Sequence, residues 1–114
     1  RDEDAMDTLW SDTDQVACLH PGWGPLFGRE EVVDSWKAII RNPDSPEILC
    51  HDPHAHVYGN TAYVICFEEI GGSFLVATNV FVRDGRLWKM VHHQAGPTSV
   101  RPEVEESVPP QSVN

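Results

Sequence analysis

Long apolar runs, paired cysteines and clustered basic residues are all lacking in this chain of 114 residues. No apolar run approaches the ~20 residues of a membrane span, and no signal-peptide pattern is present, so we expect a soluble protein. The three cysteines, Cys18, Cys50 and Cys66, are odd in number and form no Cys-x-x-Cys pair. This argues against a disulfide framework or structural zinc site and favours a cytoplasmic location.

Basic residues are also scarce, because 8 lysines and arginines stand against 18 aspartates and glutamates, a net charge of −10. The acidity is concentrated at the two ends. Residues 1–14 hold six acidic residues against one arginine, and the segment from Thr98 onward holds three against one. Nucleic-acid binding needs clustered lysine and arginine, so this class of partner is excluded. A solvated acidic surface is the simpler interpretation.

Helical periodicity is present twice, in residues 2–11 and 29–41. In both segments apolar residues recur at spacings of three and four, which predicts helices with one apolar face. Asn42-Pro43 would end the second helix. Between the two helices, residues 16–18 are expected to form a short extended piece.

Four β-strands are predicted in the second half of the chain, at Ile48–Tyr58, Ala62–Ile70, Ser73–Arg83 and Leu87–Ala95. The breaks between them are hairpin signals: Gly59-Asn60, Gly71-Gly72 and Asp84-Gly85. Helices followed by an antiparallel meander predict an α+β fold with the helices on one sheet face. We expect one domain over residues 1–97 and a disordered, acidic, proline-rich tail over 98–114.

Both faces of the predicted sheet contain apolar residues, although helices can cover only one. On the third strand one face carries Leu75, Ala77, Asn79 and Phe81, and the other carries Val76, Thr78, Val80 and Val82. On the fourth strand, strict alternation places Val91, His93 and Ala95 on one face and Trp88, Met90 and His92 on the other. An exposed apolar sheet face indicates a subunit interface, so we expect a symmetric homodimer packed through the second, outer face.

Several motifs carry a family resemblance: Pro53-His54-Ala55-His56-Val57-Tyr58-Gly59, Ala62-Tyr63-Val64, Thr78-Asn79-Val80-Phe81, Arg83-Asp84-Gly85 and Trp88-Lys89-Met90-Val91-His92. With them, residues 3–97 resemble the nuclear-transport-factor-2-like superfamily in its SnoaL-like branch, near the association domain of calcium/calmodulin-dependent protein kinase II. The resemblance implies a cone-shaped, cystatin-like fold in which a curved sheet wraps around helices and leaves a pocket. It also implies a long first helix, which would lie before Arg1. The fold hosts isomerases, dehydratases, cyclases and assembly domains, so it leaves the function open.

The resemblance also points to site residues. Pocket arginines of the kinase association domain match Ile65, Asn79 and Ala95, so an anion site of that type is not expected. In ketosteroid isomerase, an aspartate in an Asp-Pro loop is the base, and a protonated aspartate helps to hold the oxyanion. His20-Pro21 is similar in position to that loop, and Asn79 is similar in position to the protonated aspartate. We therefore take His20 as the candidate base and Asn79 with His93 as polarising groups, with His20 facing Asn79 across a cavity. Alternatively, His20 and Asn79 only hydrogen-bond a loop and a strand.

Aromatic residues from several segments are candidates for the pocket wall, although core packing is the simpler role. They are Trp10, Trp23, Trp36, Tyr63, Phe67 and Phe81. His54, His56 and His92 have the residue type of a zinc site, but Pro-His-x-His is a family strand pattern. We therefore expect no metal and no other cofactor.

The sequence favours a pocket domain for a small hydrophobic or aromatic molecule, with acid/base isomerase, dehydratase or cyclase activity as the candidate chemistry. The alternative is a non-catalytic oligomerisation or ligand-sensing module.

Overall fold

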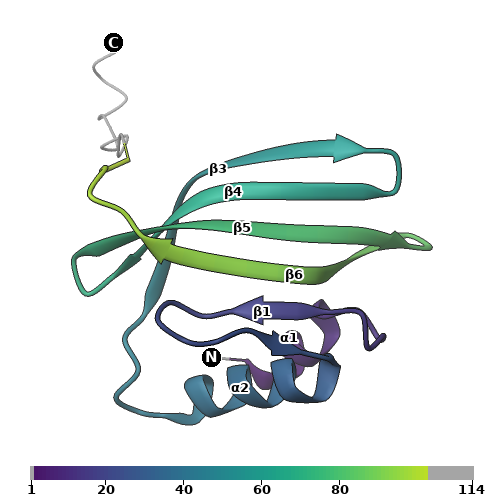
Figure 1. The fold of residues 1–114 in the computed structure, drawn as a ribbon, viewed down its shortest axis with the longest axis horizontal. Helices are drawn as coiled ribbons and strands as arrows, with labels where there is room; N and C mark the ends of the chain where they lie inside the picture. The colour runs from purple at the N-terminus through teal and green to yellow at the C-terminus, as the bar shows by residue number, and fades with distance from the viewer. Residues whose placement is uncertain (1, 103–114) are drawn as a thin grey trace, which may run out of the picture.

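The computed structural model describes residues 2–102, in which two helices pack against one face of a curved six-stranded sheet (Figure 1). In chain order the elements are α1 (Glu3–Leu9), β1 (Ala17–Leu19), β2 (Leu26–Phe27), α2 (Arg29–Arg41), β3 (Ile48–Tyr58), β4 (Thr61–Ile70), β5 (Ser73–Asp84) and β6 (Leu87–Pro97). The sheet order is β2-β1-β6-β5-β4-β3. The predicted α+β class and the four-strand meander are confirmed.

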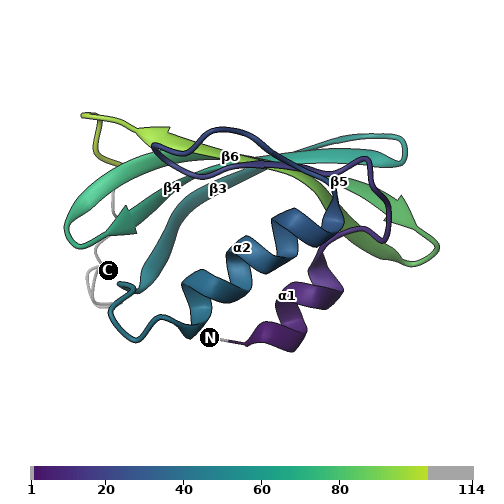
Figure 2. The same cartoon turned by 60° about the horizontal axis from the view of Figure 1, so that its bottom comes forward.

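The sheet has two parts that differ in how their strands pair. Strands β3 to β6 pair antiparallel through tight turns, whereas β1 pairs parallel with β6 and antiparallel with the short β2. The expected extended piece at residues 16–18 is β1, but the sequence did not reveal β2. Figure 2 shows both helices side by side beneath the concave face of the sheet. Neither of these helices is long and apolar enough to cross a membrane.

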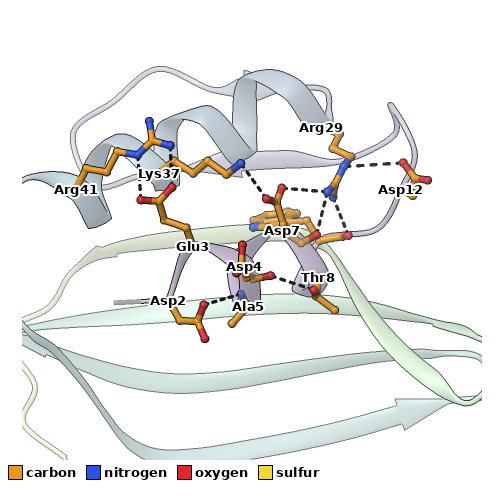
Figure 3. Close-up of polar contacts among 11 residues, drawn as sticks. Asp2, Glu3, Asp4, Ala5, Asp7, Thr8, Asp12, Arg29, Lys37 and Arg41 are labelled. Carbon is orange, nitrogen blue, oxygen red and sulfur yellow. Dashed lines mark hydrogen bonds and ion pairs between the residues drawn. The ribbon is translucent and has the colours of Figure 1, made fainter.

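Polar contacts hold α1 against α2 (Figure 3). Arg29 donates to the backbone oxygens of Trp10 and Asp7, both at 2.9 Å, at the C-terminal end of α1. Lys37 Nζ lies 2.8 Å from Asp7 Oδ2, and Arg41 forms a two-pronged pair with Glu3. These partners lower the pKa of Glu3 and Asp7. Part of the acidic N-terminus therefore serves helix packing, whereas the sequence indicated only a solvated surface.

A β-bulge in β6 changes which residues face the helices. Val80 pairs with His92 but Phe81 pairs with Met90, so Val91 is the extra residue. Because a bulge interrupts strict alternation, Met90 lies on the helix side and packs with buried Trp10 and Val32. The alternation prediction for Met90 was wrong for this reason.

The residues after β6 continue along the sheet. The Thr98 amide donates to the Phe74 carbonyl at 3.1 Å, and the Arg101 guanidinium lies over the Phe74 ring. Pro102 is buried. The expected disordered tail thus begins with a segment that packs against β5, and its remainder, residues 103–114, lies outside the described part of the chain.

Candidate functional site

A cavity of about 280 Å³ lies between α2 and the concave face of the sheet. We call this face the inner face and the opposite one the outer face. The cavity is lined by His20, Pro21, Trp23, Trp36, Ile39, Ser45, Pro46, Ile48, Glu68, Ile70, Leu75 and His93. We call it the histidine cavity, because two histidines from segments far apart in the sequence meet at its wall.

His20 follows β1 and is held by α2. The His20 side chain is almost fully buried, and its Nε2 lies 2.9 Å from Ser35 Oγ. The Ser35 hydroxyl donates its only hydrogen to the Val32 carbonyl at 2.7 Å, so Ser35 Oγ must accept from His20. His20 Nε2 therefore carries the proton, and Nδ1 holds the lone pair.

His93 on β6 has the opposite tautomer. Its Nδ1 lies 2.5 Å from Asn79 Oδ1 on the neighbouring strand β5, and a carbonyl-type oxygen only accepts. Nδ1–H is therefore the donor, and His93 Nε2 holds the lone pair. Asn79 itself is not among the residues that line the histidine cavity.

The two histidines meet through an aromatic cluster. Trp36 contacts both rings edge-on, with centroids 4.6 Å from His20 and 5.3 Å from His93, and the imidazoles are 6.4 Å apart. The Trp23 ring also packs against His20, with a centroid distance of 4.6 Å. Asn79 therefore contacts His93, whose ring centroid lies 6.4 Å from that of His20, and within the described part of the chain no hydrogen bond joins Asn79 to His20 itself.

Burial keeps both imidazoles uncharged at neutral pH. It lowers the pKa of His20 and lowers that of His93 to about 4, where the nearby His20 and His92 add to the effect. Burial raises the pKa of the Cys18 thiol, next to His20, to about 11. Cys18 is therefore a neutral packing residue and no nucleophile at neutral pH.

Glu68 is a cavity residue that the sequence reasoning missed. It lies on the inner face of β4, where it pairs with Leu75 of β5. Burial raises the pKa of its carboxyl. Its neighbour Glu69 points to the outer face and pairs with His51 at 2.8 Å.

The predicted aromatic lining is divided among three places. Trp23 and Trp36 line the histidine cavity. Trp10 is buried in the core where both helices pack against the sheet, and Phe81 packs against the same core. Tyr63 and Phe67 lie on the outer face, because they pair with Val80 and Val76. Only two of the six aromatic candidates therefore reach the cavity.

An open apolar groove of about 610 Å³ continues from the histidine cavity toward α1. It shares Trp36, Ile39 and Ile48 with the cavity and adds Met6 and Leu9 of α1. Its acidic members are Asp2 and Glu47.

The histidines of the possible metal cluster do not converge. His56 pairs with Tyr63, which pairs with Val80, which pairs with His92, so two strands separate the two histidines. The His54 side chain instead contacts Asp52, with Nε2 3.1 Å from Asp52 Oδ1. Among residues 2–102 no group of three potential metal-ligating side chains is present.

Known proteins with similar sequences support the observed fold. The model of the SnoaL-like domain family matches residues 1–98. An F-box protein, SKIP8 of Arabidopsis thaliana, is 34% identical over 95 residues, which cover 80% of this chain. The match spans only 40% of that relative's length.

Two solved structures are similar in both sequence and shape. One is a protein of the nuclear-transport-factor-2-like family from Streptomyces avermitilis, named as a candidate dehydratase, with 33% identity and a TM-score of 0.75; the match covers 87% of this chain and 83% of that one. The other, from Thiobacillus denitrificans, is named as a candidate association domain of calcium/calmodulin-dependent protein kinase type II. It is 30% identical with a TM-score of 0.70, over 84% of this chain and 82% of that one.

Proposed function

Because the chain belongs to the SnoaL-like domain family, we propose that it is a pocket domain that binds a small, largely apolar molecule in the histidine cavity. The observation that carries this proposal is the meeting of His20 and His93 at one cavity wall, where Trp36 contacts both rings and Trp23 contacts His20. Such a cavity, apolar with a few polar groups, is typical of small-molecule sites.

The candidate chemistry is proton transfer. His20 Nδ1 and His93 Nε2 each hold a lone pair, and a neutral imidazole can take a proton from a carbon acid or from water. Asn79 is then a positioning residue, which orients His93 and does not meet the ligand. Isomerase or dehydratase activity would use His20 as the base, in line with the name of the Streptomyces relative.

The test is a thermal-shift screen with a library of small apolar and aromatic compounds. We expect hits on the wild type whose shift is lost in His20→Ala and in Trp36→Phe. His56→Ala on the exposed outer face is the control and keeps the hits. Hits that persist unchanged in both cavity variants would contradict the proposal.

A second proposed role is self-association through the outer face. Ile65, Val76 and Tyr58 are 40%, 41% and 72% exposed there. Exposed apolar residues on one sheet face favour an interface between two copies of the chain. The Thiobacillus relative is named as an association domain, which also supports this role. All three cysteines are free, which fits the proposed cytoplasmic location.

A further inference from the structure

We propose that the histidine cavity binds a small organic cation, an amine or quaternary ammonium group, with Glu68 as its counter-ion. This inference rests on the proposed binding function and names the class of ligand. It follows from three properties of the cavity wall: an unpaired carboxylate, hydrogen-bond acceptors without a positive charge, and two tryptophan side chains.

The Glu68 carboxylate has no counter-ion in the described part of the chain. No hydrogen bond or ion pair reaches it from residues 2–102, although the adjacent Glu69 is paired with His51. The side chain is nevertheless partly buried in a largely apolar wall, next to Ile70 and Leu75. A buried carboxylate is stabilised by a positive partner, and since none of residues 2–102 supplies one to Glu68, we assign this role to a ligand.

The rest of the wall does not compensate this charge. None of the residues that line the histidine cavity or the adjoining groove is lysine or arginine. His20 and His93 are neutral and each has one lone-pair nitrogen, His20 Nδ1 and His93 Nε2. Asp2 and Glu47 add two more carboxylates along the groove. The electrostatic potential therefore favours cations and N–H donors and disfavours anions.

Trp23 and Trp36 supply the surface that such a cation needs. Both ring centroids lie 4.6 Å from that of His20. Trp36 is part of α2, and Trp23 is in the loop between β1 and β2. Trp23 is half exposed, so part of its indole is open to the cavity mouth. Indole rings attract ammonium groups through their negative faces, and most strongly where water is excluded. A volume of about 280 Å³ limits the ligand to a compact group.

The test compares three probes of similar shape in binding titrations followed by NMR, with the indole N–H resonances of Trp23 and Trp36 as reporters. The probes are choline, its uncharged isostere neohexanol, and the anion pivalate. We expect choline to bind roughly tenfold more tightly than neohexanol, and pivalate to bind least well. The variants are Glu68→Gln and, as a matched control on the outer face, Glu69→Gln.

In Glu68→Gln the preference for choline over neohexanol should fall to about twofold or less, while Glu69→Gln keeps it. Equal binding of choline and neohexanol to the wild type overturns the cation inference but leaves the pocket proposal standing. An equal loss in both glutamine variants overturns the role of Glu68. Failure of all three probes to shift either indole also overturns the cation inference, and the pocket proposal then depends on the thermal-shift screen alone.

Discussion

The Nδ1–H of His93 donates to Asn79 Oδ1 at 2.5 Å, and this single bond decides which nitrogen of His93 can accept a proton. The proton on Nδ1 leaves the lone pair on Nε2. Asn79 thus acts on a ligand only through His93. A donor to a developing oxyanion, as the sequence indicated, would need the Asn79 amide to reach the cavity.

Replacing Asn79 by aspartate should raise the pKa of His93. The new carboxylate would face the Nδ1–H and stabilise the imidazolium, so we expect the pKa to rise from about 4 by about one unit or more. The measurement is an NMR titration of the His93 ring protons. Asn60→Asp in the exposed turn after β3 is the control and should leave His93 unchanged. An unchanged His93 pKa in Asn79→Asp would show that the bond does not hold in solution.

Removing the Ser35 hydroxyl should allow His20 to populate both of its neutral tautomers. Ser35 Oγ is the acceptor for His20 Nε2–H, so the wild type should show one tautomer in its imidazole ¹⁵N chemical shifts. In Ser35→Ala we expect a mixture of tautomers and a loss of about 1 kcal/mol in unfolding free energy. Ser73→Ala, at an exposed strand end, is the control. A single unchanged tautomer in Ser35→Ala would contradict the assignment.

The stability of the protein should fall as the pH falls from 7 to 5. The pKa of His93 is about 4 when folded against 6.5 as its ordinary value, so below pH 6.5 the unfolded chain binds a proton that the folded protein excludes. Stability therefore decreases with falling pH, and the loss from this group between pH 7 and 5 is about 2 kcal/mol. Buried His20 shifts in the same direction and adds to the loss.

Urea unfolding at the two pH values provides the measurement. His93→Gln keeps a donor for Asn79 but does not titrate, so its loss between pH 7 and 5 should be smaller than that of the wild type. Equal losses in the wild type and in His93→Gln would refute the assignment.

Most helices and strands could be predicted from this sequence because the apolar patterns and the turn residues indicate the same element boundaries. The two-residue turn Gly71-Gly72 separates apolar runs, and both glycines adopt positive φ. Asn42 ends α2 as expected. By contrast, β2 has only two residues and is defined by pairing with β1, a contact that no local pattern encodes.

The placement of site residues was less predictable because it depends on strand register. The turn at Gly71-Gly72 pairs Ile70 with Ser73, which sets Glu68 opposite Leu75 and Phe67 opposite Val76. That register, applied to the sequence, would have put Glu68 inside and Phe67 outside. The bulge at Val91 and the bond between His93 and Asn79 depend on two strands fitting together, so a single-strand pattern could not predict them.

Arg29 and Arg41 both link α2 to α1, but only Arg29 should matter for stability. Arg29 donates to the backbone oxygens of Asp7 and Trp10, which are otherwise left without helical partners at the end of α1. We expect Arg29→Ala to lower the unfolding free energy by about 2 kcal/mol. Arg41→Ala, the matched control, removes an exposed pair with Glu3 and should change it little. Equal effects of the two variants in urea unfolding would contradict this.

A charge at the centre of the outer face should separate the proposed homodimer. In a symmetric interface one substitution appears twice, so Ile65→Lys or Val76→Lys would bury two unpaired charges between the copies. We expect the dimer dissociation constant in sedimentation equilibrium to rise roughly hundredfold for either variant. The side chains are 40% and 41% exposed in the single chain, so each variant should keep the wild-type circular dichroism spectrum.

The matched control for the outer face is Val57→Lys. Val57 pairs with Ala62, so it belongs to the inner-face side of the sheet, and it is 63% exposed at the edge strand β3. It should leave the association unchanged, because its side chain points away from the proposed interface. A monomeric wild type, or an equal weakening by Val57→Lys, would rule out the outer face as the site of association. If Val76→Lys is monomeric and still binds the small-molecule hits, the histidine cavity is complete within one chain.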